Sequence, residues 1–315
     1  MIHWGIIGAG RIAHRFAEGL AYDKEAKLYA VACRTLPKAE AFKEKYPCEV
    51  AYDSYDAILE DENIDVVYIA LPHGYHHEWS KKAILKGKAV LCEKPAMMNA
   101  KEMQEIKELS AQHQVFFMEA LKTRFIPLYI VLKKLIADGV IGDVTKVETS
   151  FCSEVPYTSE TYFYDTYQGG CLLDTGIYTL GYVDDYVKGD FTIEILDSKF
   201  EHGVDTHVKA IIKTNNATGI IECAFNQYKP RVGIITGTKG NIMIEESHRP
   251  QKAVITVDGK TPYTIEKAYE NDDFYSQIHH VNQCLLQNKI ESSIMSQDDS
   301  LRCAKIQDAI KEALQ

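Results

Sequence analysis

The 315-residue sequence has no run of about 18 apolar residues, the length that a membrane-spanning helix requires. Its first ten residues lack a basic region and a cleavage site, so we expect no signal peptide. Positive charge is in deficit, with 35 Lys and Arg against 45 Asp and Glu and a net charge of −10. Because binding to nucleic acid requires a basic surface that displaces counterions, we expect neither a nucleic acid nor a membrane as partner.

The eight cysteines form no Cys-x-x-Cys pair. Four of them, Cys33, Cys92, Cys152 and Cys223, lie in apolar or strand-like runs. This pattern favours reduced, buried thiols and a cytoplasmic location. Hydrophobic residues make up 46% and charged residues 25% of the chain, a mixture that excludes disorder, collagen and coiled coil as descriptions of the whole chain.

Short apolar runs alternate with helical patterns over the first 120 residues. This alternation is typical of βαβ units and predicts a parallel sheet. The predicted strands are 2–8, 28–33, 66–71, 89–92 and 115–118, and the predicted helices are 11–20, 37–45, 76–86 and 100–113.

The pattern changes after about residue 121. A helix is predicted over 125–138 and a closing helix after the capping-box spacing of 296–299. The fold class is therefore α/β, with a Rossmann domain over 1–121 and, over 122–315, a second α/β domain whose open sheet is largely antiparallel. The strands expected in this second domain are 145–151, 192–196, 206–213, 219–225, 232–236, 241–245 and 253–257, with hairpin turns at 215–216, 238–240 and 258–259.

Residues 8–13, Gly-Ala-Gly-Arg-Ile-Ala, follow the first predicted strand and open a helix. They fit the dinucleotide pattern G-x-G-x-x-G/A, in which Gly8 permits a tight turn and Gly10 lets a pyrophosphate approach the backbone. Arg11 and Ile12 then begin the helix whose N-terminus faces the phosphates. We expect a nicotinamide dinucleotide at this loop.

The end of the second predicted strand bears on which dinucleotide is bound. A carboxylate there would accept hydrogen bonds from the adenosine ribose, but this chain has Arg34 and Thr35 and no acidic residue before Glu40. An arginine pairs well with a 2′-phosphate, which favours NADP(H) over NAD(H). A solvated surface arginine beside an unselective site is the alternative.

Lys94 follows the fourth predicted strand, at the edge of the sheet where doubly wound folds bind ligands. An oxidised nicotinamide nearby would lower the pKa of this lysine, which could then exchange protons with a substrate oxygen. From position alone, a surface salt bridge is an equal alternative.

The chain resembles the Gfo/Idh/MocA family of oxidoreductases along nearly its whole length. Segments 118–125 and 169–178 look most like the dihydrodiol dehydrogenase branch of that family, and 299–302 is also family-like. The other residues that carry the resemblance are 8–13, Leu71, Pro72, His73, His76, Glu93, Lys94 and Pro95.

The resemblance implies a substrate between the two domains and assigns roles to several residues. Lys94 matches the family's catalytic lysine, and Asp174 and Tyr178 match its D-x-x-x-Y pair. It implies that Tyr178 is an acid/base group whose pKa the Lys94 ammonium depresses, and that Asp174 orients the substrate hydroxyl. The cofactor-binding residues expected in the strand-end loops are Leu71, Pro72, His73, His76, Glu93 and Lys94.

Two positions depart from the dihydrodiol branch. Lys122 stands where tryptophan is usual, and Gln168 replaces the first glycine of a triple. Because Lys122 alters the expected substrate pocket, aromatic-diol activity is not carried over. A carbohydrate-like small molecule is the expected substrate.

Other side chains allow competing interpretations. His73, His76 and His77 with Glu78 could suggest a metal site, but no fourth ligand stands at a recognised spacing, so we expect no metal. Cys171 has no histidine base near it in sequence, which argues against a nucleophile. A run of tyrosines before residue 169 could either stack on a sugar ring or pack in the core. Its members are Tyr157, Tyr162, Tyr164 and Tyr167.

Three function classes remain. The first is an NAD(P)-dependent oxidoreductase acting on a sugar, polyol or related compound. The second is an NAD-dependent lyase or glycosidase with an internal redox cycle, and the third is a cofactor-sensing regulator. We also expect a homodimer or homotetramer through the second sheet, whose strands carry apolar residues. These are Val208, Ile212, Ile220, Ala224, Ile234 and Ile242.

Overall fold

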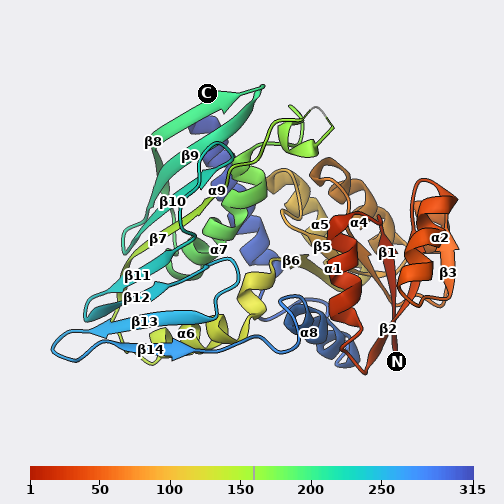
Figure 1. Ribbon diagram of the computed structural model, residues 1–315, viewed down its shortest axis with the longest axis horizontal. Helices are drawn as coiled ribbons and strands as arrows, with labels where there is room; N and C mark the ends of the chain where they lie inside the picture. Colours follow the sequence, from red (N-terminus) through yellow and green to blue (C-terminus); the bar gives the residue numbers. More distant parts are fainter. Residues whose placement is uncertain (159) are drawn as a thin grey trace. The chain divides into compact units, whose positions relative to one another are not determined.

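The computed structural model describes residues 1–158 and 160–315 and divides into two compact units (Figure 1). Unit 1 consists of 1–122 and 270–301, and unit 2 consists of 123–269 and 302–315. The division predicted at 121/122 differs from this one because residues 270–301 belong to unit 1. Helix α8 (Tyr275–Leu286) packs there on α1 (Arg11–Leu20), and Trp4 Nε1 donates to Asn282 Oδ1 at 2.9 Å.

Unit 1 contains a six-stranded parallel sheet in the order β3-β2-β1-β4-β5-β6. The predicted parallel sheet is confirmed, whereas β3 and α3 were not predicted, being only three and six residues long. The strands are β1 (Ile2–Ile7), β2 (Ala26–Ala32), β3 (Val50–Tyr52), β4 (Val66–Ile69), β5 (Ala89–Glu93) and β6 (Phe117–Ala120). The helices are α1, α2 (Leu36–Lys45), α3 (Tyr55–Glu60), η1 (His73–Tyr75), α4 (His76–Leu85), α5 (Ala100–His113) and α8.

The strand order reverses between β1 and β4, which are neighbours in the sheet. In a doubly wound sheet this reversal opens a crevice at the carboxyl ends of the two strands. Gly8 follows β1 and Leu71 lies just beyond β4. The loops that carry the expected cofactor-binding residues therefore begin at this crevice.

Unit 2 contains an eight-stranded sheet in the order β14-β13-β12-β11-β7-β10-β9-β8, antiparallel except for the β7–β10 pair. The mostly antiparallel sheet confirms the prediction, and all three expected turns join strands. The strands are β7 (Val144–Cys152), β8 (Thr192–Glu201), β9 (Val204–Lys213), β10 (Thr218–Ala224), β11 (Gly233–Gly237), β12 (Gly240–Ile244), β13 (Lys252–Val257) and β14 (Tyr263–Glu266). The helices are α6 (Pro127–Ala137), η3 (Tyr162–Tyr164), the π-helical turn η4 (Leu172–Gly176) and α7 (Ile177–Tyr186); η2 (Lys122–Phe125) and α9 (Gln297–Ala313) include residues of both units.

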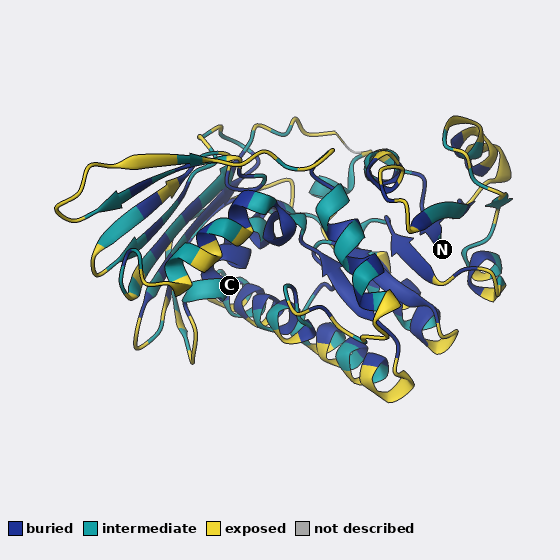
Figure 2. Ribbon diagram, turned by 90° about the horizontal axis from the view of Figure 1, so that it is seen from below, coloured by how far each residue is buried: buried dark blue, intermediate teal, exposed yellow. Residues whose placement is uncertain are grey.

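Helices lie along one face of the second sheet (Figure 2), and among them α7 packs on β7 and β10 (Figure 1). The approach is so close that a Cβ on Gly219 would lie 2.8 Å from Val183 of α7. Neither η4 nor α7 was predicted from the sequence. This stretch is buried on nearly all sides, including several of its polar residues, so its sequence shows no amphipathic period.

The other face of this sheet carries a transverse apolar row. Pairing between neighbouring strands aligns five apolar side chains, with Glu148 of β7 among them, and all five are partly exposed. The residues proposed for assembly need correction, because Val208, Ile212, Ala224 and Ile242 have 0% exposure within the chain itself. Ile220 and Ile234 of the expected set do lie on the outer face, in a row with Ile211, Met243 and Val254.

The closing helix begins with the capping box that the sequence predicts. Asp299 N–H donates to Ser296 Oγ at 3.1 Å, and Ser296 N–H donates to Asp299 Oδ2 at 3.0 Å. Each side chain thereby satisfies a backbone donor that the first helical turn leaves unpaired. Among the described helices, none is both long and apolar enough to cross a membrane.

Candidate functional site

The loop after β1 has the shape that a dinucleotide requires. Gly8 has φ +96°, and a Cβ there would lie 2.7 Å from the carbonyl oxygen of Ala70. Gly10 is the N-cap of α1, no side chain caps this helix start, and a Cβ at Gly10 would meet no atom within 4 Å among the described residues. The start of α1 thus has no side-chain cap and has space beside Gly10, a combination that suits a phosphate at the helix N-terminus.

Arg34 and Thr35 follow β2, and both are exposed. Thr35 is the N-cap of α2, but its side chain makes no capping hydrogen bond in the described structure. A guanidinium and a hydroxyl are thus presented together at the carboxyl end of β2. This is the strand end where the adenosine ribose lies in doubly wound dinucleotide sites.

Lys94 lies just after β5 in an otherwise buried segment. In the described stretch 88–98, it is the one residue whose side chain is partly exposed. Its peptide bond to Pro95 is cis, and Ala96 N–H donates to Glu119 Oε1 at 2.8 Å. Glu119 of β6 therefore holds the segment after Lys94 in place, while the lysine itself remains accessible.

Glu93, one residue earlier, is buried with 8% exposure and is held by the Tyr68 hydroxyl, which donates to its carboxylate. Burial raises the pKa of Glu93 above its ordinary value, although the Tyr68 hydrogen bond and the positive charges of Lys94 and Lys122 act in the opposite direction.

His76 packs against the backbone of the segment that carries Lys94. It is fully buried, with its Nδ1 2.9 Å from the Pro95 carbonyl oxygen and its Nε2 2.8 Å from the Leu71 carbonyl oxygen. Burial is the main cause of a lowered pKa for this histidine. His73 precedes it in η1 with 3% exposure, and the two rings are 5.8 Å apart. His76 thus joins the loop after β4 to the loop after β5.

Lys122 does not project into open space. Its Nζ pairs with Asp273 Oδ2 at 2.5 Å and lies 4.3 Å from the centre of the Phe274 ring. Arg15 of α1 pairs with the other oxygen of Asp273, also at 2.5 Å. Asp273 was not predicted as a site residue, and its position between Arg15 and Lys122 depends on α8 packing in unit 1.

In unit 2, Asp174 and Tyr178 share one accessible strip of a buried helix. In the described stretch 171–184, only these two residues are partly exposed. Tyr178 packs on Phe151 of β7 and on His248, with ring centres 5.3 Å and 6.2 Å away. The D-x-x-x-Y pair is therefore presented on one face, with an aromatic wall behind the tyrosine.

The start of this helix is anchored by residues that the sequence analysis did not identify. Asp205 Oδ2 accepts the Leu172 N–H at 2.7 Å and the Cys171 thiol at 3.2 Å. Gln307, with 1% exposure, donates to the Leu172 carbonyl oxygen at 3.1 Å. Burial raises the pKa of Cys171 well above its ordinary value, which makes a thiolate nucleophile unfavourable.

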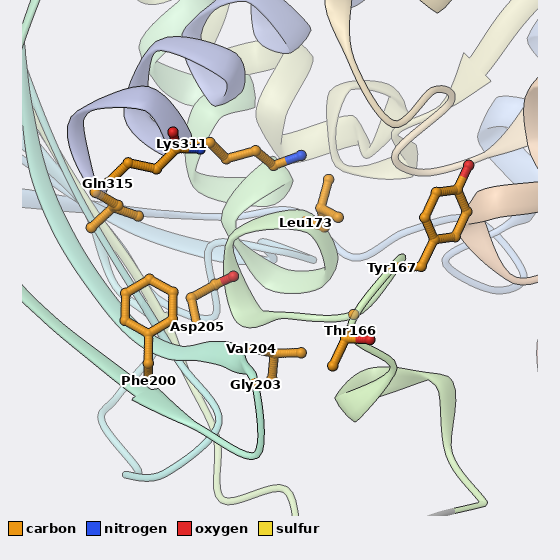
Figure 3. Close-up of a pocket in the computed structure, with 11 residues that line it drawn as sticks. Thr166, Tyr167, Leu173, Phe200, Gly203, Val204, Asp205, Lys311 and Gln315 are labelled. Carbon is orange, nitrogen blue, oxygen red and sulfur yellow. The ribbon is translucent and has the colours of Figure 1, made fainter.

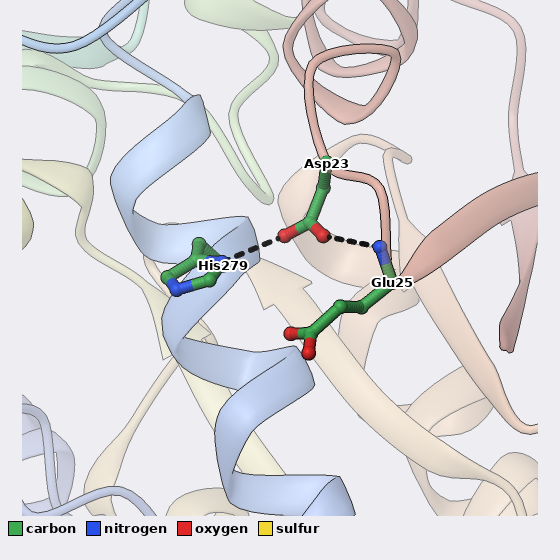
Figure 4. Close-up of side chains that lie close together, drawn as sticks. All are labelled: Asp23, Glu25 and His279. Atoms are coloured by element: carbon green, nitrogen blue, oxygen red, sulfur yellow. Dashed lines mark hydrogen bonds and ion pairs between the residues drawn. The ribbon is translucent and has the colours of Figure 1, made fainter.

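Asp23, Glu25 and His279 form a cluster of potential metal ligands in unit 1, with ligand atoms within 4.8 Å of one another (Figure 4). Each oxygen of Asp23 already accepts hydrogen bonds, from Glu25 N–H, His279 and Asn282. Burial opposes ionisation of Asp23, but these hydrogen bonds outweigh it and lower its pKa. The cluster therefore serves to fasten α8 to the turn before β2. The histidines singled out earlier also have partners, since His77 pairs with Glu105 at 3.1 Å.

Comparison with known proteins agrees with this geometry. Residues 2–121 match the model of an oxidoreductase family with an NAD-binding Rossmann fold, and residues 129–243 match the GFO/IDH/MocA C-terminal domain. The trans-1,2-dihydrobenzene-1,2-diol dehydrogenase of Xenopus tropicalis is 33% identical, covering 99% of this chain and 97% of that protein. The corresponding enzyme of Mus musculus is 31% identical with the same coverage.

Solved structures share the fold. Aldose-aldose oxidoreductase from Caulobacter crescentus matches with a TM-score of 0.90 at 22% identity, covering 99% of this chain and 97% of that chain. A 3-ketoreductase from Actinomadura kijaniata, in complex with NADP and TDP-benzene, matches with a TM-score of 0.87 at 23% identity and the same coverage. The chain therefore belongs to the Gfo/Idh/MocA family and is an NAD(P)-binding oxidoreductase.

Proposed function

We propose that the protein transfers hydride between NADP(H) and a sugar, polyol or related hydroxyl or carbonyl compound. One observation carries the proposal. In two segments that are otherwise buried, 88–98 and 171–184, the residues left accessible are Lys94, Asp174 and Tyr178. These are side chains that can move or hold a proton at a substrate oxygen.

The bound dinucleotide supplies or accepts the hydride, and the chain's own residues manage the proton. Lys94 donates a hydrogen bond to the reacting oxygen and exchanges a proton with it. Tyr178 acts on the same oxygen as a phenolic acid/base, and Asp174 orients the substrate hydroxyl. His76 contacts the carbonyl group of Pro95, which follows Lys94, and that of Leu71 in the loop after β4, and so keeps the lysine in position. We also propose a reducing, cytoplasmic location, in keeping with eight free thiols.

The proposed substrate is polar and carbohydrate-like. The dihydrodiol dehydrogenases supply the sequence relationship, but Lys122 is engaged in an ion pair with Asp273 where that branch usually has tryptophan. This ion pair takes the place of the aromatic face that tryptophan would offer to an aromatic diol. Relatives by fold include the aldose-aldose oxidoreductase and a levoglucosan dehydrogenase, whose substrates are sugars by name.

Kinetics of two variants test the proposed chemistry. Lys94→Ala should keep cofactor binding and lower kcat by roughly two or more orders of magnitude, the usual scale for a positioned proton donor. Tyr178→Phe should lower kcat less than Lys94→Ala does if Lys94 is the main acid. It should lower kcat by as much if the Tyr178 phenol is the main acid. NADPH oxidation with a panel of sugars and ketoses is the assay, with NADPH affinity as the control. Unchanged turnover in both variants would contradict the assignment of these residues, and NADPH binding by the wild type without turnover of any compound in the panel would favour a cofactor-sensing regulator.

The same assay separates the oxidoreductase from the lyase or glycosidase alternative. An oxidoreductase consumes one NADPH for each substrate reduced, whereas an internal redox cycle converts substrate with no net change in cofactor. Product analysis beside absorbance at the nicotinamide band therefore decides between them.

Cofactor preference is tested at Arg34. Replacing it with alanine should weaken NADPH binding by roughly 1.5–3 kcal/mol and leave NADH binding unchanged, because only the phosphorylated ribose offers a charge-assisted contact. Lys38, at the start of α2, provides a matched control that removes a positive charge nearby. Equal affinity of the native protein for the two cofactors would refute the preference.

A further inference from the structure

Unit 2 holds a pocket of about 380 Å³ that none of the proposed catalytic side chains lines (Figure 3). It lies between the β8–β9 hairpin, the end of α9 and the segment before η4. The volume is within the range of ligand sites. The side chains used below are Phe200, Asp205, Lys311, Leu173, Thr166 and Tyr167.

Backbone geometry shapes this pocket. Gly203, in the β8–β9 turn, has φ +84°, and a Cβ there would lie 2.8 Å from Thr166 Cγ2. A Cβ on Gly169 would lie 2.4 Å from the Phe163 carbonyl oxygen. Gly203 therefore lets the hairpin approach the segment before η4, and Gly169 lets that segment fold closely on itself. The pocket wall is thus a specific arrangement of backbone.

The polar groups in the pocket carry both signs of charge. Asp205 is held in place by the Leu172 N–H and the Cys171 thiol, which both donate to Oδ2. A carboxylate accepts up to about four hydrogen bonds, so Asp205 retains capacity for a ligand hydroxyl. Burial raises the pKa of Asp205 above its ordinary value, while its hydrogen bonds to Leu172 and Cys171 act in the opposite direction. Lys311 brings an ammonium group from α9, and Figure 3 shows its side chain extending towards Leu173.

Aromatic side chains complete the lining. Phe200 pairs with Asp205 across the β8–β9 hairpin, so its ring stands beside the carboxylate. The ring is 56% exposed, and Tyr167 on the opposite wall is 69% exposed. Large aromatic groups are normally buried, and exposed ones that gather at a cavity mark a binding surface.

We propose that this pocket is a binding site for a neutral polyhydroxylated ring, such as a sugar or cyclic polyol. Vicinal hydroxyl groups both donate and accept, which matches Asp205 and Lys311, while the apolar face of the ring packs on Phe200. An anionic ligand is disfavoured by Asp205, and a cationic one by Lys311. The site lies beside Leu173, one residue from Asp174, and contacts the same helix start.

Binding of glucose to the full-length protein without cofactor tests this site, measured by calorimetry and by saturation-transfer NMR. We expect wild type to bind glucose, and Phe200→Ala to weaken binding about two- to tenfold through loss of ring packing. Leu196→Ala is the matched control, because Leu196 is 45% exposed on the same strand and does not line the pocket. Lys311→Met, which keeps the aliphatic stem, should weaken glucose binding more than Phe200→Ala does.

Two additional arms distinguish this pocket from the proposed active site. Tyr178→Phe should leave glucose binding at the pocket unchanged, even if it abolishes turnover, so failure of the proposed chemistry and failure of this site give different results. Glucuronate and glucosamine should both bind more weakly than glucose. The proposal is overturned if wild type does not bind glucose, if Phe200→Ala and Lys311→Met bind it like wild type, if the charged sugars bind better, or if Tyr178→Phe abolishes binding.

Discussion

Two glycines of the dinucleotide loop should fail in opposite ways when replaced by alanine. At Gly10, φ is −84° and a Cβ meets no described atom within 4 Å, so the apo protein should tolerate the change to within about 1 kcal/mol. The added methyl group fills the space that a pyrophosphate needs. Loss of the charge-assisted hydrogen bonds between the phosphates and the helix start costs roughly 1.5–3 kcal/mol, which should weaken NADPH binding by about 10- to 150-fold.

At Gly8 the damage should appear without cofactor. A non-glycine residue at φ +96° is strained by about 1–3 kcal/mol, and the new Cβ would lie 2.7 Å from the Ala70 carbonyl oxygen, so the backbone just after β4 must shift as well. Gly87→Ala is the matched control, because Gly87 has φ +71° and a Cβ there would meet no described atom within 4 Å. It therefore reports strain alone.

Urea unfolding of the apo proteins and NADPH fluorescence titrations measure both effects. Gly8→Ala should lose more stability than Gly87→Ala, and Gly10→Ala should unfold like wild type yet bind NADPH poorly. The reasoning is refuted if Gly10→Ala binds NADPH as tightly as wild type, or if it is destabilised as much as Gly8→Ala.

Three further predictions concern stability and assembly. Burial and the positive charges nearby lower the pKa of His280 to about 4 from an ordinary 6.5. Its contribution to stability should therefore be present above about pH 6.5 and be lost as the pH falls towards 4. The urea midpoints of the wild type and of His280→Gln, measured against pH, should converge in acid. Arg124 (1% exposed) pairs with Asp184 (0% exposed) at 2.6 Å, so Arg124→Met should lower the free energy of unfolding by about 3–5 kcal/mol. The role of burial would be contradicted if this loss were smaller than the loss caused by removing a solvent-exposed ion pair. If the outer apolar row mediates assembly, the double variant Ile220→Glu/Met243→Glu should give a monomer by light scattering, whereas a wild-type monomer would count against assembly.

Local patterns in the sequence were sufficient for much of the architecture. Alternation of apolar runs and helical periods predicted the parallel and antiparallel sheets, since buried strands and amphipathic helices differ in residue period. The reciprocal Ser296–Asp299 cap and the Gly8–Gly10 turn were also predictable, because both depend on residues close in sequence. The family resemblance added Lys94, Asp174 and Tyr178, which lie in separate parts of the chain.

Tertiary structure decided what depends on distant partners. Residues 270–301 join unit 1 because Trp4, Asp23 and α8 hold one another across more than 250 residues of sequence, and no local signal marks such contacts. The burial of Val208 and Ile242 follows from which face of the sheet α7 covers. Asp205 anchors a helix start 33 residues away. Sequence periodicity reports how one element divides apolar from polar side chains, but only packing determines which element lies against that face.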